Sequence, residues 1–398
     1  MALPIVCIPP TLNRLFIPYG EFFTKPQFKH FKRLVTGLIV SDNKTLQEIN
    51  DAFGERNQSN LNRFVNGAID MDGLNRLRLH QVKNTFRLKR RGIVIVDESL
   101  LHKTGRMMEL AGSHRSGITK KIAWGHMAVN CFYTDGDGNE FPVKTDIYVK
   151  QKDCVNRVFF TKREIALQQI DFAMQEDLPV GLVIVDAGYE GEEFTRELKS
   201  RLLDFIIGVR VTTKASFNRE ERISIGEYLS TLTDDEFDFV IENNQAYFYH
   251  IVPCSIRGIG MVKLVISYVD GDEENVKCYI TNLEEDNETI IKLLIKRWRI
   301  ECFHRDAKQH LGLEAYQVRK GRGMQVVALA CLIAYTLVKL AARILKTPFR
   351  PLSTIGEFCR YLRLIAYKGV IWVRTKLKNP FEFIKILKKL VFVKNAKV

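Results

Sequence analysis

Three acidic residues stand at places from which they could act on one substrate. Asp97 and Asp186 each end an apolar, β-branched run of nearly the same composition, starting at Gly92 and at Gly181. Such a run is typical of a buried strand, and an acid at its carboxyl end lies at the rim of an α/β sheet. If the two strands are neighbours, the carboxylates reach one point and suit a hard cation such as Mg2+. A third carboxylate, from a helix over that rim, would complete a two-metal site able to cut a phosphodiester.

Glu301 is the candidate for the third acid, because it lies on a predicted amphipathic helix from about 287 to 312. Arg297, Arg305 and Lys308 fall on nearly the same face of that helix, within roughly 80° at about 100° per residue. Cations in these positions could hold DNA phosphates beside the metals. The helix therefore combines a metal ligand with phosphate-binding groups.

An apolar stripe runs along the neighbouring face of this helix and predicts the side that packs on the core. Trp298 belongs to the stripe, so we expect it to be a core residue rather than a platform for base stacking. The stripe consists of Ile291, Ile295, Trp298 and Cys302. The alternative is an ordinary amphipathic surface helix with i,i+4 ion pairs and no bound metal.

Other acids and histidines near these positions fit the site less well. Glu98 follows Asp97 directly, so its side chain should point to the opposite face of the strand. Asp306 lies about 140° around the helix from Glu301, and Glu314 lies beyond the helix end. A structural role is the expectation for three histidines that follow the first acid, namely His102, His114 and His126. The alternative to a catalytic role, for Asp97 or Asp186 considered alone, is that of a turn or cap residue at the end of a strand.

The whole chain is strongly basic. Its 398 residues carry a net charge of +14, with a pI near 9.3, and nucleic acid is the commonest polyanionic partner of such proteins. A membrane surface is the rival partner, but the apolar run 326–338 is too short to span a bilayer, and we expect no signal peptide. The eight cysteines form no CxxC pair, which excludes zinc-finger spacing and favours reduced thiols in a cytosolic protein.

The N-terminal part of the sequence reads as helical. Two short helices, at 45–53 and from Ser59 to Val65, flank a glycine-containing turn and have helix-turn-helix dimensions. Asn62 and Arg63 on the second helix suit contacts to base edges or phosphates. A plain helical bundle is the alternative. A third helix is predicted from about 73 to 90.

Beyond residue 90, apolar strands alternate with helices and then give way to a β-rich stretch. This pattern predicts an α/β class, with a mixed sheet flanked by helices. Strands are expected at 92–97, 124–132, 140–148, 181–186, 205–209, 238–241, 246–251, 262–269 and 277–280, and further helices at 162–175, 192–203 and 324–345.

These patterns divide the chain into five parts. We expect an N-terminal arm and helical DNA-binding domain at 1–90, the first part of a catalytic core at 91–209, a β-rich insertion at 210–282, the second part of the core with the Glu301 helix at 283–345, and a basic C-terminal helical region at 346–398.

The spacing of the site residues resembles that of DDE transposases of the IS4 and IS701 type. Arg297, Glu301 and Lys308 are similar to that group's tyrosine–arginine–glutamate–lysine signature, with the arginine four residues before the glutamate and the lysine seven after it. The signature's tyrosine would fall at Leu294, so its hydroxyl is missing from that position.

The segments around the two aspartates also resemble that group. Asp186 with the following Ala-Gly-Tyr is similar to the segment of the second aspartate, and Asp97 with 102–105 to that of the first. A β-rich insertion between the second aspartate and the glutamate is a further feature of the group. The placement of the three acids at two strand ends and on a cationic helix predicts that their carboxyl groups converge to roughly 4–8 Å from one another, as bridging two ions requires.

The resemblance implies an RNase H-like catalytic domain and an enzyme that cuts DNA at the ends of its own insertion sequence. The freed 3′-hydroxyl would then attack target DNA. Asp97, Asp186 and Glu301 would hold two Mg2+ ions, with Mn2+ able to substitute, and the partners would be double-stranded DNA, with its terminal inverted repeats and target, and a second copy in a homodimer. A cytoplasmic, nucleoid-associated prokaryotic protein with no membrane contact is implied. The alternatives are a DDE-type nuclease that no longer transposes and a domesticated DNA-binding protein with inactive acids.

Overall fold

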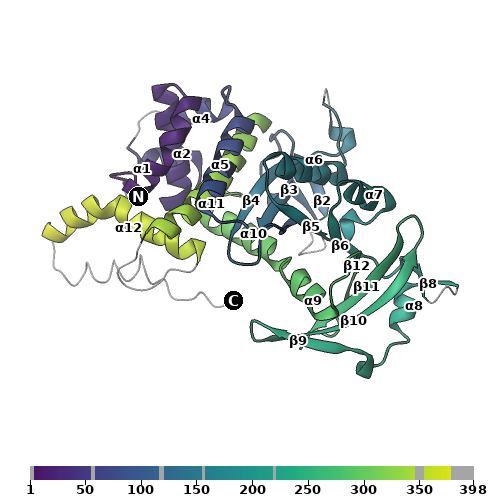
Figure 1. The fold of residues 1–398 in the computed structure, drawn as a ribbon. Helices are drawn as coiled ribbons and strands as arrows, with labels where there is room; N and C mark the ends of the chain where they lie inside the picture. The colour runs from purple at the N-terminus through teal and green to yellow at the C-terminus, as the bar shows by residue number, and fades with distance from the viewer. Residues whose placement is uncertain are drawn as a thin grey trace.

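One mixed sheet of twelve strands is formed by residues 92–281; helices cover its faces, and the helices from the two ends of the chain lie beside it (Figure 1). The computed structural model describes residues 4–54, 59–115, 121–154, 157–217, 221–345 and 354–377, and every count of elements refers to these residues. The predicted α/β class is confirmed. The strands differ in length and direction, and the catalytic candidates lie where parallel and antiparallel pairing meet.

The first six strands form the expected RNase H-like core. They are β1 (Gly92–His102), β2 (Gly112–Arg115), β3 (Ile122–Thr134), β4 (Glu140–Tyr148), β5 (Val180–Val185) and β6 (Asp204–Val209). The two apolar runs predicted to be neighbours are β1 and β5, which pair in parallel, and β6 pairs in parallel with β5. On its other side β1 pairs antiparallel with β3, and β3 in turn pairs antiparallel with β4. The short β2 pairs with the start of β3.

The stretch from 210 to 282 is rich in strands, as expected, and it extends the core sheet. Its elements are β7 (Lys214–Ser216), β8 (Arg222–Ser224), α8 (Ile225–Leu229), η4 (Asp234–Glu236), β9 (Asp238–Glu242), β10 (Gln245–Ile256), β11 (Gly260–Val269) and β12 (Lys277–Thr281). β12 pairs antiparallel with β6, and β11, β10, β7 and β8 follow in order, with β9 on β10. The backbone hydrogen bonds of the core therefore continue into this stretch without an intervening linker.

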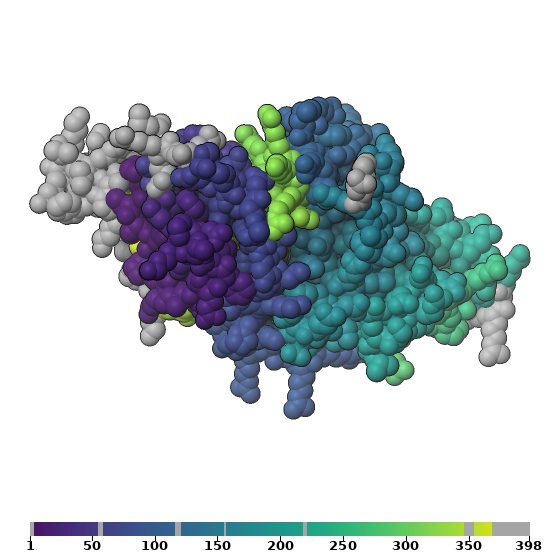
Figure 2. All heavy atoms as spheres, turned by 90° about the horizontal axis from the view of Figure 1, so that it is seen from above, coloured from purple at the N-terminus to yellow at the C-terminus, as the bar shows by residue number. Residues whose placement is uncertain are grey.

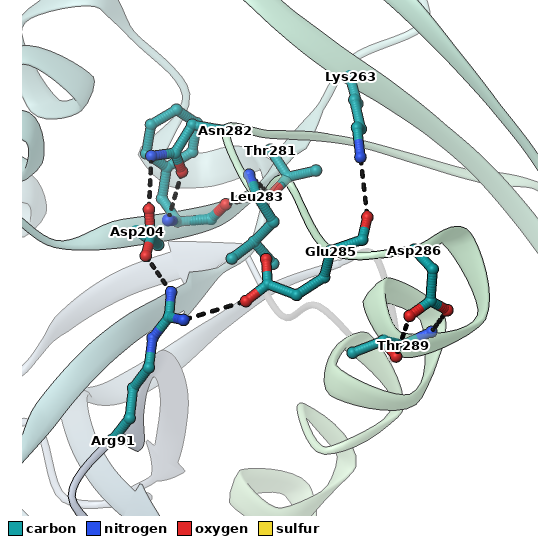
Figure 3. Close-up of polar contacts among 10 residues, drawn as sticks. Arg91, Asp204, Lys263, Thr281, Asn282, Leu283, Glu285, Asp286 and Thr289 are labelled. Atoms are coloured by element: carbon teal, nitrogen blue, oxygen red, sulfur yellow. Dashed lines mark hydrogen bonds and ion pairs between the residues drawn. The ribbon is translucent and has the colours of Figure 1, made fainter.

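The segment that returns from β12 to the core is fixed by polar contacts (Figure 3). Arg91, just before β1, pairs with Asp204 at the start of β6 and, over 3.0 Å, with Glu285. The Asn282 amide donates to the same Asp204 carboxylate, and Asp286 caps the next helix by accepting the N–H of Thr289. These contacts set the position at which α9 begins, the helix that precedes the one carrying the third acid.

Helices cover both faces of the core sheet (Figure 1). They are α6 (Lys162–Gln175), α7 (Glu192–Ser200), α9 (Asn287–Ile295) and α10 (Trp298–Leu311), with the short turns η2 (Gln151–Asp153) and η3 (Ala187–Tyr189) between strands and helices. The Phe303 ring of α10 stacks on Phe132 of β3 at 5.5 Å. From the other face, Gln169 of α6 donates to the Val129 carbonyl of the same strand. The sheet is thus buried on both sides where β1, β3 and β5 run.

The N-terminal helices pack around one long buried helix. They are α1 (Pro10–Phe16), η1 (Ile17–Phe22), α2 (Lys25–Val40), α3 (Leu46–Ala52), α4 (Ser59–Asn66) and α5 (Met71–Thr85), and the buried helix is α11 (Gly321–Ile344). α11 is long and apolar enough to cross a membrane, but 83% of its apolar window is buried inside the protein. Figure 2 shows its light-green start between the N-terminal helices and the sheet, where Arg322 donates to Gly67 and the Gly321 N–H donates to Glu109.

Arg78 of α5 ties the N-terminal helices to the sheet. It is fully buried and donates to the carbonyls of Pro142 and Val143 on β4, to Thr336 of α11 and to Asn75 of its own helix. Burial lowers its pKa to about 10. Among the described residues no carboxylate is paired with this guanidinium, so carbonyl and hydroxyl oxygens alone satisfy it.

The prediction of one continuous helix from 287 to 312 is wrong, because two helices, α9 and α10, occupy this stretch. α9 ends at Ile295, and the N–H groups of Lys296 and Arg297 bond to carbonyls three residues earlier. Such 3-10 bonding turns the chain by about 20° more per residue than an α-helix, which rotates α10 relative to the predicted stripe. The buried face of α10 consists of Ile300, Phe303, Ala307 and Leu311. Trp298 is therefore 55% exposed, and its assignment to the core is wrong.

Smaller departures occur near the two ends of the chain. Part of the expected N-terminal arm is helical, as α1 and η1. α5 ends at Thr85 rather than near residue 90, because Phe86 is extended and its ring stacks on Phe141. The expected basic C-terminal helix begins as α12 (Ile355–Leu377), and its predicted continuation at 378–398 lies outside the described residues.

Candidate active site

Asp97 and Asp186 lie next to each other where two parallel strands part. The β1–β5 pairing ends at Val96 and Val185, so the two aspartates are the next residues on each strand. β5 stops there, whereas β1 continues along β3 to His102, so Asp97 is within a strand and not at its end as expected. The strand that continues forms one wall of the site.

A cavity of about 1180 Å3 opens at this point and brings the three predicted acids together. Asp97 and Asp186 line it from the sheet, and Glu301 lines it from α10. Six cationic side chains, three of them predicted, surround the acids; they are Arg115, Lys150, Lys162, Arg297, Arg305 and Lys308. The chemistry of the cavity is thus that of a carboxylate cluster within a positive rim.

Burial and mutual repulsion control the charge of the first aspartate. Burial, and next the charge of Asp186, raise the pKa of Asp97 to about 7. Oδ1 of Asp97 accepts the N–H of Glu98 over 2.8 Å, and Oδ1 of Asp186 accepts the N–H of Gly188 over 2.8 Å. A divalent cation between the two carboxylates would remove the repulsion that keeps one of them partly protonated.

A glycine in the adjacent strand makes room for Asp186. A Cβ added at Gly208 of β6 would lie 2.5 Å from the backbone nitrogen of Ala187 and 2.9 Å from the carbonyl carbon of Asp186. Real Cβ atoms do not approach so closely, so any side chain at position 208 would displace the second aspartate. Tyr279 of β12 pairs with Gly208 on the other side.

Glu301 is held by Arg297 one helical turn earlier. Nη2 of Arg297 lies 2.5 Å from Oε1 of Glu301; the Arg297 side chain is mostly buried, and the Glu301 side chain is half-buried. Burial opposes the charge of Arg297, but the charges of Tyr279 and Glu301 raise its pKa above the ordinary value. In this ion pair the positive charge of Arg297 balances the negative charge of Glu301.

The other predicted cations have different environments. Lys308 donates to the Leu100 carbonyl of β1 over 2.9 Å, and burial lowers its pKa. Arg305 is 53% exposed and lies at the cavity wall. Arg63 and Asn62 are exposed on α4 among the N-terminal helices and do not belong to this cavity; Arg63 bonds there to the side chains of Ser59 and Asn60.

The donor set of the cavity fits a hard divalent cation. All three acids offer carboxylate oxygens, which are the ligands that Mg2+ prefers. Within the described part of the chain, no group of three His, Cys, Asp or Glu side chains lies close enough to hold a metal ion. Convergence of the three carboxyl groups to metal-bridging distances therefore stays a prediction, and Glu301 would have to exchange Arg297 for a metal.

The competing acids and histidines have different surroundings. Glu98, expected on the opposite face of the strand, pairs with Lys162 of α6, and both side chains line the cavity with the three acids. His126 is buried and bonded to the Glu109 carbonyl and the Tyr316 hydroxyl, which is a structural role. His102 and His114 line the cavity.

Two site residues do not follow from the sequence patterns. His304, three residues after Glu301, lies 3.9 Å from Asp97 through Nδ1, and the i,i+3 spacing from the glutamate could have indicated it. Burial, then Lys308 and Arg297, lower the pKa of His304 to about 3, so its ring is neutral.

Tyr279 of β12 brings a hydroxyl to Arg297, just before α10. Leu294, at the signature position, is buried on α9. Tyr279 reaches Arg297 from β12 and accepts a hydrogen bond from it, and burial raises the Tyr279 pKa. No local pattern links a residue of β12 to this helix, so the sequence carries no signal for it.

Comparison with known families agrees with this architecture. The chain matches the DDE superfamily endonucleases over residues 19–224, which is more than half of its length. It also matches the transposase DDE domain over residues 162–337, a range that includes Asp186 and Glu301. No curated protein matches the chain.

Proposed function

Because the chain belongs to the DDE superfamily of endonucleases, we propose that it is a DNA transposase of the IS4 and IS701 type. It would cut at the ends of its own insertion sequence and join the 3′-hydroxyl ends to target DNA. The single observation that carries the proposal is the cavity lined by Asp97, Asp186 and Glu301 from three separate elements and bordered by cations.

The three acids would hold two Mg2+ ions, or Mn2+ in their place. Bound there, the ions would activate the attacking oxygen and stabilise the leaving oxygen of a phosphodiester. The neighbouring groups act on the acids themselves. Arg297 holds Glu301 in the cavity until a metal replaces it, backbone N–H groups orient the two aspartates, and Gly208 leaves the space that Asp186 occupies.

The basic groups would bind double-stranded DNA at two places. Arg297, Arg305 and Lys308 would contact phosphates near the cut, and Asn62 and Arg63 of α4 would contact the terminal repeats. The net charge of +14 supports a polyanionic partner. A homodimer bridging two element ends, in the cytoplasm of a prokaryote at the nucleoid, completes the proposal.

Two other functions share this site. A DDE-type nuclease that no longer transposes would cut element-end DNA without joining it to a target. A domesticated DNA-binding protein would bind such DNA without cutting it. Strand-transfer and nicking assays therefore separate all three functions.

Glu301→Gln tests the proposal most directly, with Glu288→Gln of α9 as a matched control. Glu288 pairs with Lys292 on the surface and is outside the cavity. We expect Glu301→Gln to bind element-end DNA but to lose nicking in Mg2+, because it keeps shape and removes a metal ligand. The control should nick as the wild type does. Full nicking by Glu301→Gln would overturn the assignment of the third acid.

Arg305→Ala tests the phosphate contacts. It should weaken binding of element-end DNA and reduce the salt slope by about one unit, since one fewer counterion is released. An unchanged slope, measured between two salt concentrations, would remove Arg305 from the DNA surface.

A further inference from the structure

A row of polar side chains crosses three neighbouring strands beneath α10 and ends at Asp97. Asp97 of β1 is paired with Asn130 of β3, and Asn130 is paired with Thr145 of β4. Cross-strand partners project to the same face of a sheet, so the three side chains form one line. α10 covers this face and sets His304 against the line.

The hydrogen bonds along this row run in one direction. The Thr145 hydroxyl donates to Oδ1 of Asn130 over 2.8 Å, which turns the Asn130 amide nitrogen toward the helix. That nitrogen lies 3.1 Å from Nε2 of His304 and donates to it, since an amide NH2 cannot accept. A neutral imidazole that accepts at Nε2 carries its proton on Nδ1. The row therefore fixes the tautomer of His304.

The protonated nitrogen faces Oδ2, the second oxygen of the first aspartate. Oδ1 of Asp97 is already occupied by the N–H of Glu98, whereas Oδ2 lies 3.9 Å from Nδ1 of His304. This distance is about 1 Å longer than a hydrogen bond, so a small rotation of the carboxylate is enough to form one. Asn130 is fully buried, so water does not compete for the row from that side.

We propose that His304, held in its Nδ1–H form by Asn130 and Thr145, is the positioning residue of Asp97 and orients that carboxylate to bind the metal. The inference rests on the proposed function, in which Asp97 is a metal ligand. If the inference holds, α10 has two roles: it carries Glu301, the third acid, and through His304 it orients Asp97, the first acid. Partners that orient ligating groups in this way are worth about 10–100-fold in metal affinity or activity.

Three substitutions of His304 separate positioning from packing. In His304→Asn the amide NH2 falls where Nδ1–H was, and in His304→Gln it falls near Nε2. His304→Ala removes both groups. We expect Asn to bind Mn2+ within a few-fold of the wild type, and Gln and Ala to bind it roughly 10–100-fold more weakly. Mn2+ binding is measured by electron paramagnetic resonance on the full chain without DNA, with the thermal midpoint recorded for each variant.

Nicking of element-end DNA gives the second measurement. The Gln and Ala variants should need more Mg2+ for half-maximal nicking and should approach the wild-type rate at saturating metal. Wild-type Mn2+ affinity in folded Ala and Gln variants would overturn the inference. Equal losses in Asn and Gln, with lowered thermal midpoints, would also overturn it in favour of a packing role. If Ala does not fold, the Asn and Gln pair still decides.

Failure of the proposed function gives a different pattern. A wild-type protein that binds Mn2+ but never nicks DNA contradicts the proposed enzyme, while the order of Mn2+ affinities in the variants still tests His304. A wild-type protein that nicks DNA, with all three variants unchanged, contradicts the positioning inference alone.

Discussion

Replacing Lys44 by Met should stabilise the protein, and the gain should shrink as the pH rises. The Lys44 ammonium is buried in the loop between α2 and α3, and among the described residues it has no hydrogen-bond partner. Cβ and Cγ of Lys44 pack closely against Gly312, at the end of α10. The charged and titratable groups that act on it are Cys359, Arg363, Asp42 and Cys331. Lys44 in turn acts on His310 of α10, whose pKa is lowered by burial first and then by cations that include Lys44. Asp42 and Arg363 pair with each other, so neither is free to compensate the lysine.

The size of the effect follows from the pKa of Lys44, which burial lowers from 10.5 to about 7. In the unfolded chain Lys44 keeps the ordinary pKa, so between about pH 7 and pH 10.5 the unfolded chain binds one proton that the folded protein does not. The free energy of unfolding therefore rises with pH over this range. Below about pH 6 the buried charge costs about 5 kcal/mol, at pH 7 about 4 kcal/mol and at pH 9 about 2 kcal/mol. Met fills the same space and cannot ionise, so it removes this cost.

Urea unfolding of the wild type and of Lys44→Met at about pH 6, 7, 8 and 9 measures the difference. Lys121→Met, at an exposed position before β3, is the matched control and should change stability by less than about 0.5 kcal/mol. The reasoning is refuted if the difference between wild type and Lys44→Met is the same at both ends of this pH range. It is equally refuted if the variant is less stable at pH 6.

Three further predictions concern single contacts. Arg78→Leu leaves two buried carbonyls of β4 without a donor and should lower the free energy of unfolding by about 3–5 kcal/mol in urea titrations; a loss below about 1 kcal/mol would contradict it. Gly208→Ala should displace Asp186, lower the free energy of unfolding by about 1–3 kcal/mol and weaken Mn2+ binding. Unchanged Mn2+ binding, measured by calorimetry, would contradict this prediction and would show that the backbone of β6 shifts to accommodate the added methyl group. Tyr279→Phe removes the hydroxyl bonded to Arg297 and should weaken element-end DNA binding by roughly 2- to 10-fold in gel-shift assays. Unchanged DNA binding would show that the hydroxyl contributes only to the stability of the fold.

Local patterns predicted the core elements well. β4 has the predicted bounds 140–148, because a glycine-rich hairpin turn precedes it and apolar residues alternate within it. α6 has the predicted bounds 162–175, and Thr161 and Glu164 form a capping box that marks its start. Both signals lie within a few residues of the boundary that they set, so they need no knowledge of the fold.

The helix of the third acid shows where local patterns fail. Periodicity assumed an unbroken α-helix, but two residues with 3-10 bonding between α9 and α10 changed the phase. The buried positions of α10 are Ile300, Phe303, Ala307 and Leu311, and Trp298 is exposed. The break depends on packing of each helix against a different part of the sheet, which the sequence does not display.

The site was predicted in part for the same reason. Asp97 and Asp186 follow from repeated strand patterns and Glu301 from its helix face, and all three line one cavity. Asn130 and His304 are 174 residues apart, and their contact depends on strand register and on the seating of α10. Contacts of that range have no periodic signal in a single sequence.

The unbroken sheet has a mechanical consequence. β6 is bonded to β5 on one edge and to β12 on the other, so the strand beside Asp186 is also the strand from which the β-rich stretch continues. A force applied to the distant hairpin of β9 and β10 would be carried by ladder hydrogen bonds, which resist stretching, rather than absorbed by a hinge. The stretch can therefore move relative to the cavity only by bending the sheet, and strain there would reach the second aspartate through the strands between them.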